Sequence, residues 1–232
     1  GHLLKRFVVE GGSIALFAAM LIVLQLVDSF TVTRGLQASG VPFALAKSLK
    51  GIYDRGQPLV QLGLVVATAL SATLLPSLTT AFARGQHHRF EQTAAQLIRF
   101  NLALSTAATA GLVVVMPAVN WLLFGDRDGQ LALQTYVVAI ILVAMINAYN
   151  AILQSLNRYR GTTRTLMIGF VVKLVSNQWL VTRFGTLGAS IATLLALGVI
   201  TWLLVIQVPT TIRQSANRDH FYAKLIAITA AM

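Results

Sequence analysis

Long apolar stretches separated by short charged segments dominate the pattern along this chain. Four of them run for more than 25 residues without a charged side chain. A membrane-spanning helix needs about 20 mostly apolar residues, so each stretch predicts a span. Two further apolar segments each contain a single charged residue, Asp28 in one and Lys173 in the other. Six spanning helices are therefore expected, at residues 12–32, 58–82, 100–124, 131–156, 165–181 and 187–208. A truncated seventh is expected to begin near Phe221.

The spans are predicted to be helices rather than strands. They are rich in Ala and Leu and show no alternation of apolar and polar positions. In lipid every backbone polar group must be satisfied within the segment, which a helix achieves by itself. The pattern therefore predicts an all-α polytopic bundle. Residues 1–11 are expected to be an interfacial lead-in helix, 12–208 the six-helix bundle, and 209–232 a cytoplasmic loop with the start of the seventh helix.

Composition agrees with a membrane environment. Hydrophobic residues make up 56% of the chain and charged residues only 11%, less than half of what soluble domains carry. The net charge of +11 does not indicate nucleic-acid binding, because the cations are scattered among apolar stretches and form no recognised motif. The chain has no Cys, which excludes disulfides and thiolate metal sites. With neither an initiator Met nor a signal-peptide pattern, we expect a segment of a longer protein.

The distribution of Lys and Arg between loops predicts the orientation. Eleven of these cations fall on the side of the N-terminal residues and the His87/His88 loop, and six fall on the other side. Cytoplasmic loops carry an excess of Lys and Arg. The first side is therefore expected to be cytoplasmic.

Asp28 and Lys173 are candidate functional residues because charges inside membrane helices are costly and face protein or water. Asp28 could bind a cation or proton, orient a polar substrate, or form a structural ion pair with Arg34, Arg55 or Lys173. Lys173, with Asn177 one turn later, could meet an anionic headgroup, reach the interface, or pair with Asp28. The residues leave these alternatives open.

The segment "YDRGQP", which ends an outer loop, is a second candidate. Gly56 and Pro58 suit a helix start, and Asp54 lies near its positive end. The structural interpretation is that this segment caps the start of the following helix. The functional interpretation is that Lys50 and Arg55 line an outward vestibule, where an Arg fork suits phosphate or pyrophosphate.

A third candidate is a row of amides in the fourth helix. Asn147, Asn150, Gln154 and Asn157 are spaced so that they share one face. Hydrogen bonds between helices would explain them, and the polar wall of a transport cavity is the alternative. The full candidate set is Asp28, Arg34, Lys50, Asp54, Arg55, Gln57, Asn147, Asn150, Gln154 and Lys173.

Enzymatic chemistry is not expected. His87 and His88 lie in a predicted loop without carboxylates at metal-binding spacing, so no metal site is predicted. No catalytic constellation and no phosphate-binding glycine loop is visible. The expectation is a protein without a cofactor and without catalytic residues.

Four stretches together resemble a known family. These are "LQLVDSFTV", "GIYDRGQPLVQLGLVVATALSATLLPSL", "NAYNAILQSLNRYR" and "RFGTLGASIATLL". They are similar to the polysaccharide-transport and stage V sporulation protein B-like branch of the MOP flippase superfamily, which includes MurJ-type lipid II flippases of Gram-positive bacteria. The segment 54–58 is the most specific part, and the resemblance covers nearly the whole chain.

The resemblance implies a transporter of two helical bundles around a cavity that opens alternately to each side, with this chain matching the second bundle. It implies a cargo of undecaprenyl-pyrophosphate-linked sugar or muropeptide, contact with membrane lipids, and a driving force that is either an ion gradient or the membrane potential. Three alternatives remain: a flippase for another polymer, a cation-coupled multidrug exporter of the same superfamily, and a polytopic membrane glycosyltransferase or ligase.

Overall fold

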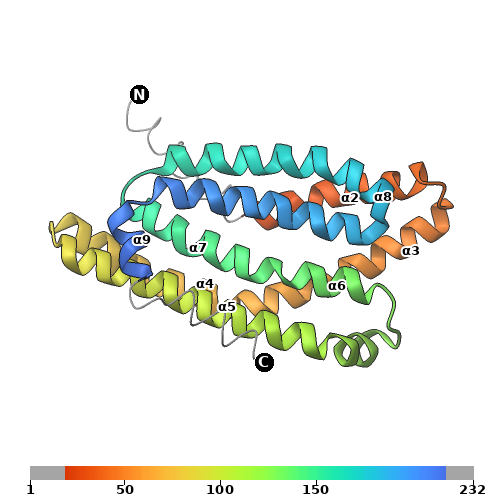
Figure 1. Ribbon diagram of the computed structural model, residues 1–232, viewed down its shortest axis with the longest axis horizontal. Coiled ribbons are helices and arrows are strands. Elements are labelled where there is room, and N and C mark those ends of the chain that lie inside the picture. The colour runs from red at the N-terminus through yellow and green to blue at the C-terminus, as the bar shows by residue number, and fades with distance from the viewer. Residues whose placement is uncertain (1–18, 218–232) are drawn as a thin grey trace.

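The computed structural model describes residues 19–217, and within this range the chain is a bundle of helices without strands (Figure 1). The all-α prediction is thus confirmed. The expected lead-in helix and the seventh helix lie outside the described residues. The helices are α2 (Met20–Ala38), α3 (Phe43–Asp54), α4 (Gly56–Ala83), α5 (His87–Phe124), α6 (Gln130–Val137), α7 (Ala139–Ser155), α8 (Tyr159–Gln207) and α9 (Thr210–Ala216).

Four segments of the described residues are long and apolar enough to cross a membrane. They are Phe43–Ala83, which joins α3 to α4, His87–Phe124, Gln130–Ser155, which joins α6 to α7, and Gly161–Gln207 in α8. The described part of α2, which includes Asp28 and Arg34, is not among the four. The predicted number of six differs because of α2 and because α8 counts as one segment.

Helix α8 is in fact two antiparallel arms. Gly185 has φ 60° and ψ −139°, values outside the helical region. Lys173 Nζ donates a hydrogen bond to the carbonyl oxygen of Ala189, 16 positions later, over 3.2 Å. A straight helix would separate such positions by about 24 Å. The arms, residues 159–184 and 186–207, therefore fold back on each other (Figure 1) and match the fifth and sixth predicted helices.

Helix α7 lies at the centre of the bundle and packs against α4, α5 and α8. Several of its apolar side chains, such as Ile140, Ile146 and Ile152, are completely buried. By contrast, large apolar side chains such as Leu62 on α4 and Leu122 on α5 are exposed. This distribution is expected where lipid rather than water surrounds the bundle.

The connections between helices fall at two opposite ends of the bundle (Figure 1). Residues 84–86, 156–158 and 208–209 lie at one end, near α9, and 39–42, 125–129 and Gly185 lie at the other. At the α9 end, Arg99 donates hydrogen bonds to the carbonyl oxygens of Ser215 and Ala216, each over 2.9 Å. A cation at the carbonyl end of a helix satisfies groups that the helix leaves unpaired.

Several predicted boundaries were wrong, mostly where helices continue beyond the apolar segments. His87 and His88 form the exposed first turn of α5 rather than a loop. The first predicted helix was expected to end at residue 32, whereas α2 continues to Ala38. The segment "PFALAKSLKG" of the outer loop has the pattern of a short amphipathic helix, and α3 does begin there, at Phe43. Asn157 lies beyond the end of α7 with φ 56°, so it does not extend the row of amides.

Candidate functional site

A buried ion pair joins the first and fifth predicted helices. Lys173 Nζ lies 2.6 Å from Asp28 Oδ1, and the two residues are 0% and 1% exposed. Of the three partners considered for Asp28, the structure brings Lys173 to it. Replacing one member of such a pair leaves an uncompensated buried charge, which typically costs about 3–5 kcal/mol. The pair therefore ties α2 firmly to α8.

Three further oxygen atoms surround the Lys173 ammonium. Thr193 Oγ1 is 2.7 Å away, and Asn177 Oδ1 and the Ala189 carbonyl oxygen are each 3.2 Å away. These three come from the two arms of α8, and all three residues are buried. With the Asp28 carboxylate, four oxygens enclose one nitrogen, and we call this group the Lys173 cage.

Tyr53 brings α3 into the same cluster. Its hydroxyl donates a hydrogen bond to Asp28 Oδ2 over 3.0 Å and lies 3.3 Å from Thr193 Oγ1. Its ring meets Tyr136 of α6 edge-on, with ring centroids 5.3 Å apart. Sequence reasoning missed Tyr53 and Thr193. Tyr53 stands directly before Asp54 in "YDRG", and Thr193 lies in "RFGTLGASIATLL" without a charged neighbour that would draw attention to it. Only the fold brings the two residues to Asp28.

Arg55 forms a second charged cluster near the end of the bundle that holds residues 125–129. Its guanidinium donates to both carboxylate oxygens of Asp126, over 2.6 and 2.9 Å, and stacks 4.5 Å above the Phe124 ring. The Arg55 hydrogen bonds hold the pKa of the Asp126 carboxyl below its usual value. The sequence analysis did not select Asp126. Its carboxylate binds the Arg55 guanidinium, the group that was expected to bind phosphate.

The other candidates at this end are differently placed. Lys50 pairs with Asp54, one turn apart on α3. Arg34 is exposed and has no ion-pair partner in the range 19–217. Gln57 is half-buried in the first turn of α4. Lys50 and Asp54 therefore lie next to Arg55 along the chain, but each cation has its own carboxylate.

A polar groove lies between α4 and α7. It encloses about 150 Å³ and is lined by Thr68, Ser71, Ala72, Leu75, Asn147, Asn150, Ala151 and Gln154. The described residues offer no hydrogen-bond partner to the side-chain amides of Asn147, Asn150 or Gln154, although Asn150 is only 5% exposed. Amides without partners are costly where no polar group or water can reach them. These amides therefore do not make the expected hydrogen bonds between helices. Their side chains face the groove instead.

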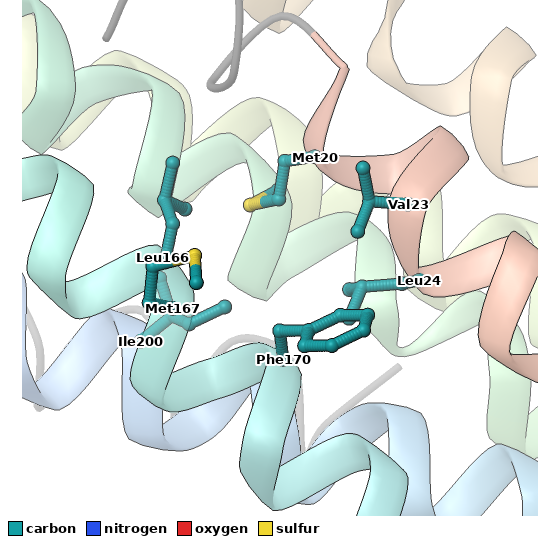
Figure 2. Close-up of a pocket in the computed structure, with 7 residues that line it drawn as sticks. All are labelled: Met20, Val23, Leu24, Leu166, Met167, Phe170 and Ile200. Atoms are coloured by element: carbon teal, nitrogen blue, oxygen red, sulfur yellow. The ribbon is translucent and has the colours of Figure 1, made fainter.

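A second cavity, of about 180 Å³, has a different character (Figure 2). Met20, Val23 and Leu24 of α2 face Leu166, Met167, Phe170 and Ile200 of α8 across it. These side chains are all apolar. A charged or hydroxylated headgroup would find no partner there, so the cavity does not suit a polar ligand.

Metal-binding residues do not cluster in the described part of the chain. No group of three or more His, Asp or Glu side chains is close enough there to hold a metal ion. His87 and His88 are consecutive, exposed residues in the first turn of α5.

Taken together, the apolar helices, the buried ion pair and the polar groove define a polytopic membrane protein with polar groups inside the bundle. Comparison with known proteins identifies its relatives. The chain is 32% identical over 227 residues to "Uncharacterized membrane protein YabM" of Bacillus subtilis (strain 168), a match that covers 98% of this chain and 42% of that protein. It is 31% identical over 153 residues to "Lipid II flippase MurJ" of the same organism, covering 64% and 28%.

A third relative is archaeal. The "Probable low-salt glycan biosynthesis flippase Agl15" of Haloferax volcanii is 24% identical over 164 residues, covering 68% of this chain and 34% of that protein. No family model and no solved structure matches the chain. The chain spans less than half the length of each of these relatives. It is a homologue of these proteins, two of which are named as flippases, and this confirms the resemblance to MurJ-type flippases carried by its motifs.

Proposed function

We propose that the protein containing this chain is a flippase that moves an undecaprenyl-pyrophosphate-linked cell-wall precursor, either lipid II or a polysaccharide repeat unit, across the cytoplasmic membrane. The homology to two proteins named as flippases supports this. The observation that carries it in the structure is the row of unpaired amides on α7, because a membrane helix exposes such groups only toward water or a polar ligand.

In this proposal residues 12–208 form one of two bundles, and the groove between α4 and α7 faces the cavity between them. The amides of Asn147, Asn150 and Gln154 supply donors and acceptors for hydroxyl and amide groups of the cargo headgroup. Arg55 and Lys50 lie toward one end of the bundle, where Asp126 and Asp54 hold them until pyrophosphate competes for them. Alternating access arises from one bundle rocking against the other.

The Lys and Arg distribution supports an orientation with the α9 end in the cytoplasm. The driving force is proposed to be the membrane potential or an ion gradient. The cargo and the membrane lipids are the proposed partners, and the proposal includes no cofactor.

A flippase for other lipid-linked glycans is the second candidate, favoured by the match to the archaeal glycan biosynthesis flippase. The same groove would serve it, because sugars of either class present hydroxyl groups. The two candidates differ in headgroup selectivity alone.

The multidrug exporter and the glycosyltransferase have less support. An exporter of cationic drugs needs a free carboxylate in its cavity, yet Asp28 is 1% exposed and pairs with Lys173. Two of the three relatives are named as flippases, and neither of those names describes a transferase or ligase.

Complementation tests the proposal. The full chain containing this sequence is expressed in a bacterium depleted of its essential lipid II flippase, beside an Asn150→Leu variant that closes the groove with an apolar side chain. Thr73→Val, an exposed position on α4, is the matched control. Growth rescue by the unmodified protein and by the control, with at least a tenfold loss of viable cells for the groove variant, is the expected result.

Membrane levels of all three proteins are measured by immunoblot, so that loss of protein is separated from loss of transport. Growth rescue by Asn150→Leu at an equal membrane level would show that the groove is not part of the cargo path. Failure of the unmodified protein to rescue, at a normal level, would favour the second candidate over lipid II.

A further inference from the structure

The Lys173 cage has the composition of a cation site rather than of an ordinary salt bridge. Four oxygens, from a carboxylate, an amide, a backbone carbonyl and a hydroxyl, surround the Lys173 nitrogen at 2.6–3.2 Å. Oxygen sets of this kind are what hard metal cations prefer in proteins. In this chain the centre is an ammonium on a four-carbon stem.

The cage is built by more than one element. Asp28 comes from α2, Asn177 from the first arm of α8, and Ala189 and Thr193 from the second arm. The Asn177 amide is held in place by its own hydrogen bond to Thr31 of α2. The Asp28 carboxylate also accepts a hydrogen bond from Tyr53. Two of the four oxygen-bearing groups are therefore positioned by contacts that do not involve the ammonium.

We propose that Lys173 is a covalently tethered cation occupying a site for a monovalent metal ion, so that α2 and the arms of α8 are held together without a free ion. Two consequences follow. The unmodified protein gains no stability from any particular alkali cation. Shortening Lys173 leaves Asp28 unpaired in an oxygen-lined space, which then takes up Na⁺ or K⁺.

The test measures the unfolding temperature of the full chain, purified in detergent, at constant ionic strength in NaCl, KCl or choline chloride. Choline is too large for the cage. The unmodified protein is expected to unfold at the same temperature in all three salts. Lys173→Ala is expected to unfold about 3–6 °C higher in NaCl or KCl than in choline chloride, with a saturable dependence on concentration.

Two controls make the effect specific to the cage. The double variant Asp28→Asn/Lys173→Ala lacks the carboxylate and should lose the difference between salts. Lys47→Ala removes an exposed lysine of α3 and should behave like the unmodified protein.

Two results would overturn the proposal. One is a folded Lys173→Ala that responds equally to choline and Na⁺. The other needs no variant of Lys173: stabilisation of the unmodified protein by Na⁺ or K⁺ over choline, abolished by Asp28→Asn, would mean that a free ion already serves this cluster.

Discussion

Single side chains in this bundle are held by specific partners, and Tyr53 is an example. Its hydroxyl donates to Asp28 and closes the cluster from the side of α3. Tyr53→Phe keeps the ring against Tyr136 and deletes the hydroxyl with its contacts to Asp28 and Thr193. We expect the free energy of unfolding to fall by about 1.5–3 kcal/mol, the usual contribution of a hydrogen bond to a charged group.

Chemical denaturation of the detergent-solubilised protein measures this change. Tyr159→Phe is the matched control, because Tyr159 lies at the start of α8 and its hydroxyl makes no hydrogen bond within residues 19–217. An equal loss in both variants would show that Tyr53 contributes through its ring environment and not through Asp28.

The Arg55–Asp126 pair predicts a dependence on pH. Hydrogen bonds from Arg55 lower the pKa of Asp126 in the folded protein, so the pair stabilises the fold above the ordinary Asp pKa of about 3.9 and is lost as pH falls through the lower folded value. Asp126→Asn should therefore lower the unfolding temperature at pH 7. The difference from the unmodified protein should disappear in strong acid.

Asp128→Asn is the control for that measurement, since the Asp128 contacts to Asp126 and Asn120 use its backbone. A difference between Asp126→Asn and the unmodified protein that persists unchanged into strong acid would contradict the ion-pair explanation.

At the scale of elements, the turn in α8 determines how its arms pack. A Cβ atom on Gly188 would lie 2.1 Å from the Leu180 carbonyl oxygen, a backbone atom that cannot rotate away. Gly188→Ala should therefore destabilise the bundle by about 1–3 kcal/mol. Gly198→Ala, in the same arm but with no atom within 4 Å of the new Cβ, should stabilise it by about 0.5–1 kcal/mol.

Thermal unfolding of the two variants checks this prediction. Because both replace a helical Gly by Ala, helix propensity alone would shift them in the same direction. Shifts of the same sign would contradict the close contact between the arms.

The sequence predicts the elements better than their ends. Uncharged stretches locate α4, α5, α6–α7 and the second arm of α8, because lipid selects for apolar length. The first arm of α8 is located by an apolar segment that carries Lys173. The sequence does not show that α5 begins at His87, since polar residues outside the bilayer are compatible with either helix or loop.

The sequence likewise cannot choose a partner for Asp28 among Arg34, Arg55 and Lys173. That choice depends on how α2 packs against α8, which no local pattern records. The row of amides was recognisable from its spacing, but the absence of partners for it was not.

For the molecule as a whole, the two sets of connections predict a labelling pattern. The segment has no Cys, so a cysteine introduced here adds a single reporter once any cysteines in the rest of the full chain are removed. With the α9 end in the cytoplasm, His88→Cys should react with a membrane-impermeant thiol reagent only after the cells are opened. Lys47→Cys, near the other end, should react in intact cells.

Both positions are exposed in the structure, so the comparison reports sidedness and not burial. The opposite pattern would reverse the proposed orientation, and labelling of both in intact cells would contradict two-sided connections.

The antiparallel arms of α8 have a consequence for biosynthesis. A Lys at the centre of a lone helix opposes insertion by about 2.5–3.5 kcal/mol. Two of the residues that accept a hydrogen bond from the Lys173 ammonium, Ala189 and Thr193, lie on the arm that is synthesised later. We therefore expect the first arm to stay at the translocation machinery until residue 193 has emerged. The two arms should then enter the bilayer together, as one helical hairpin that packs against the inserted α2.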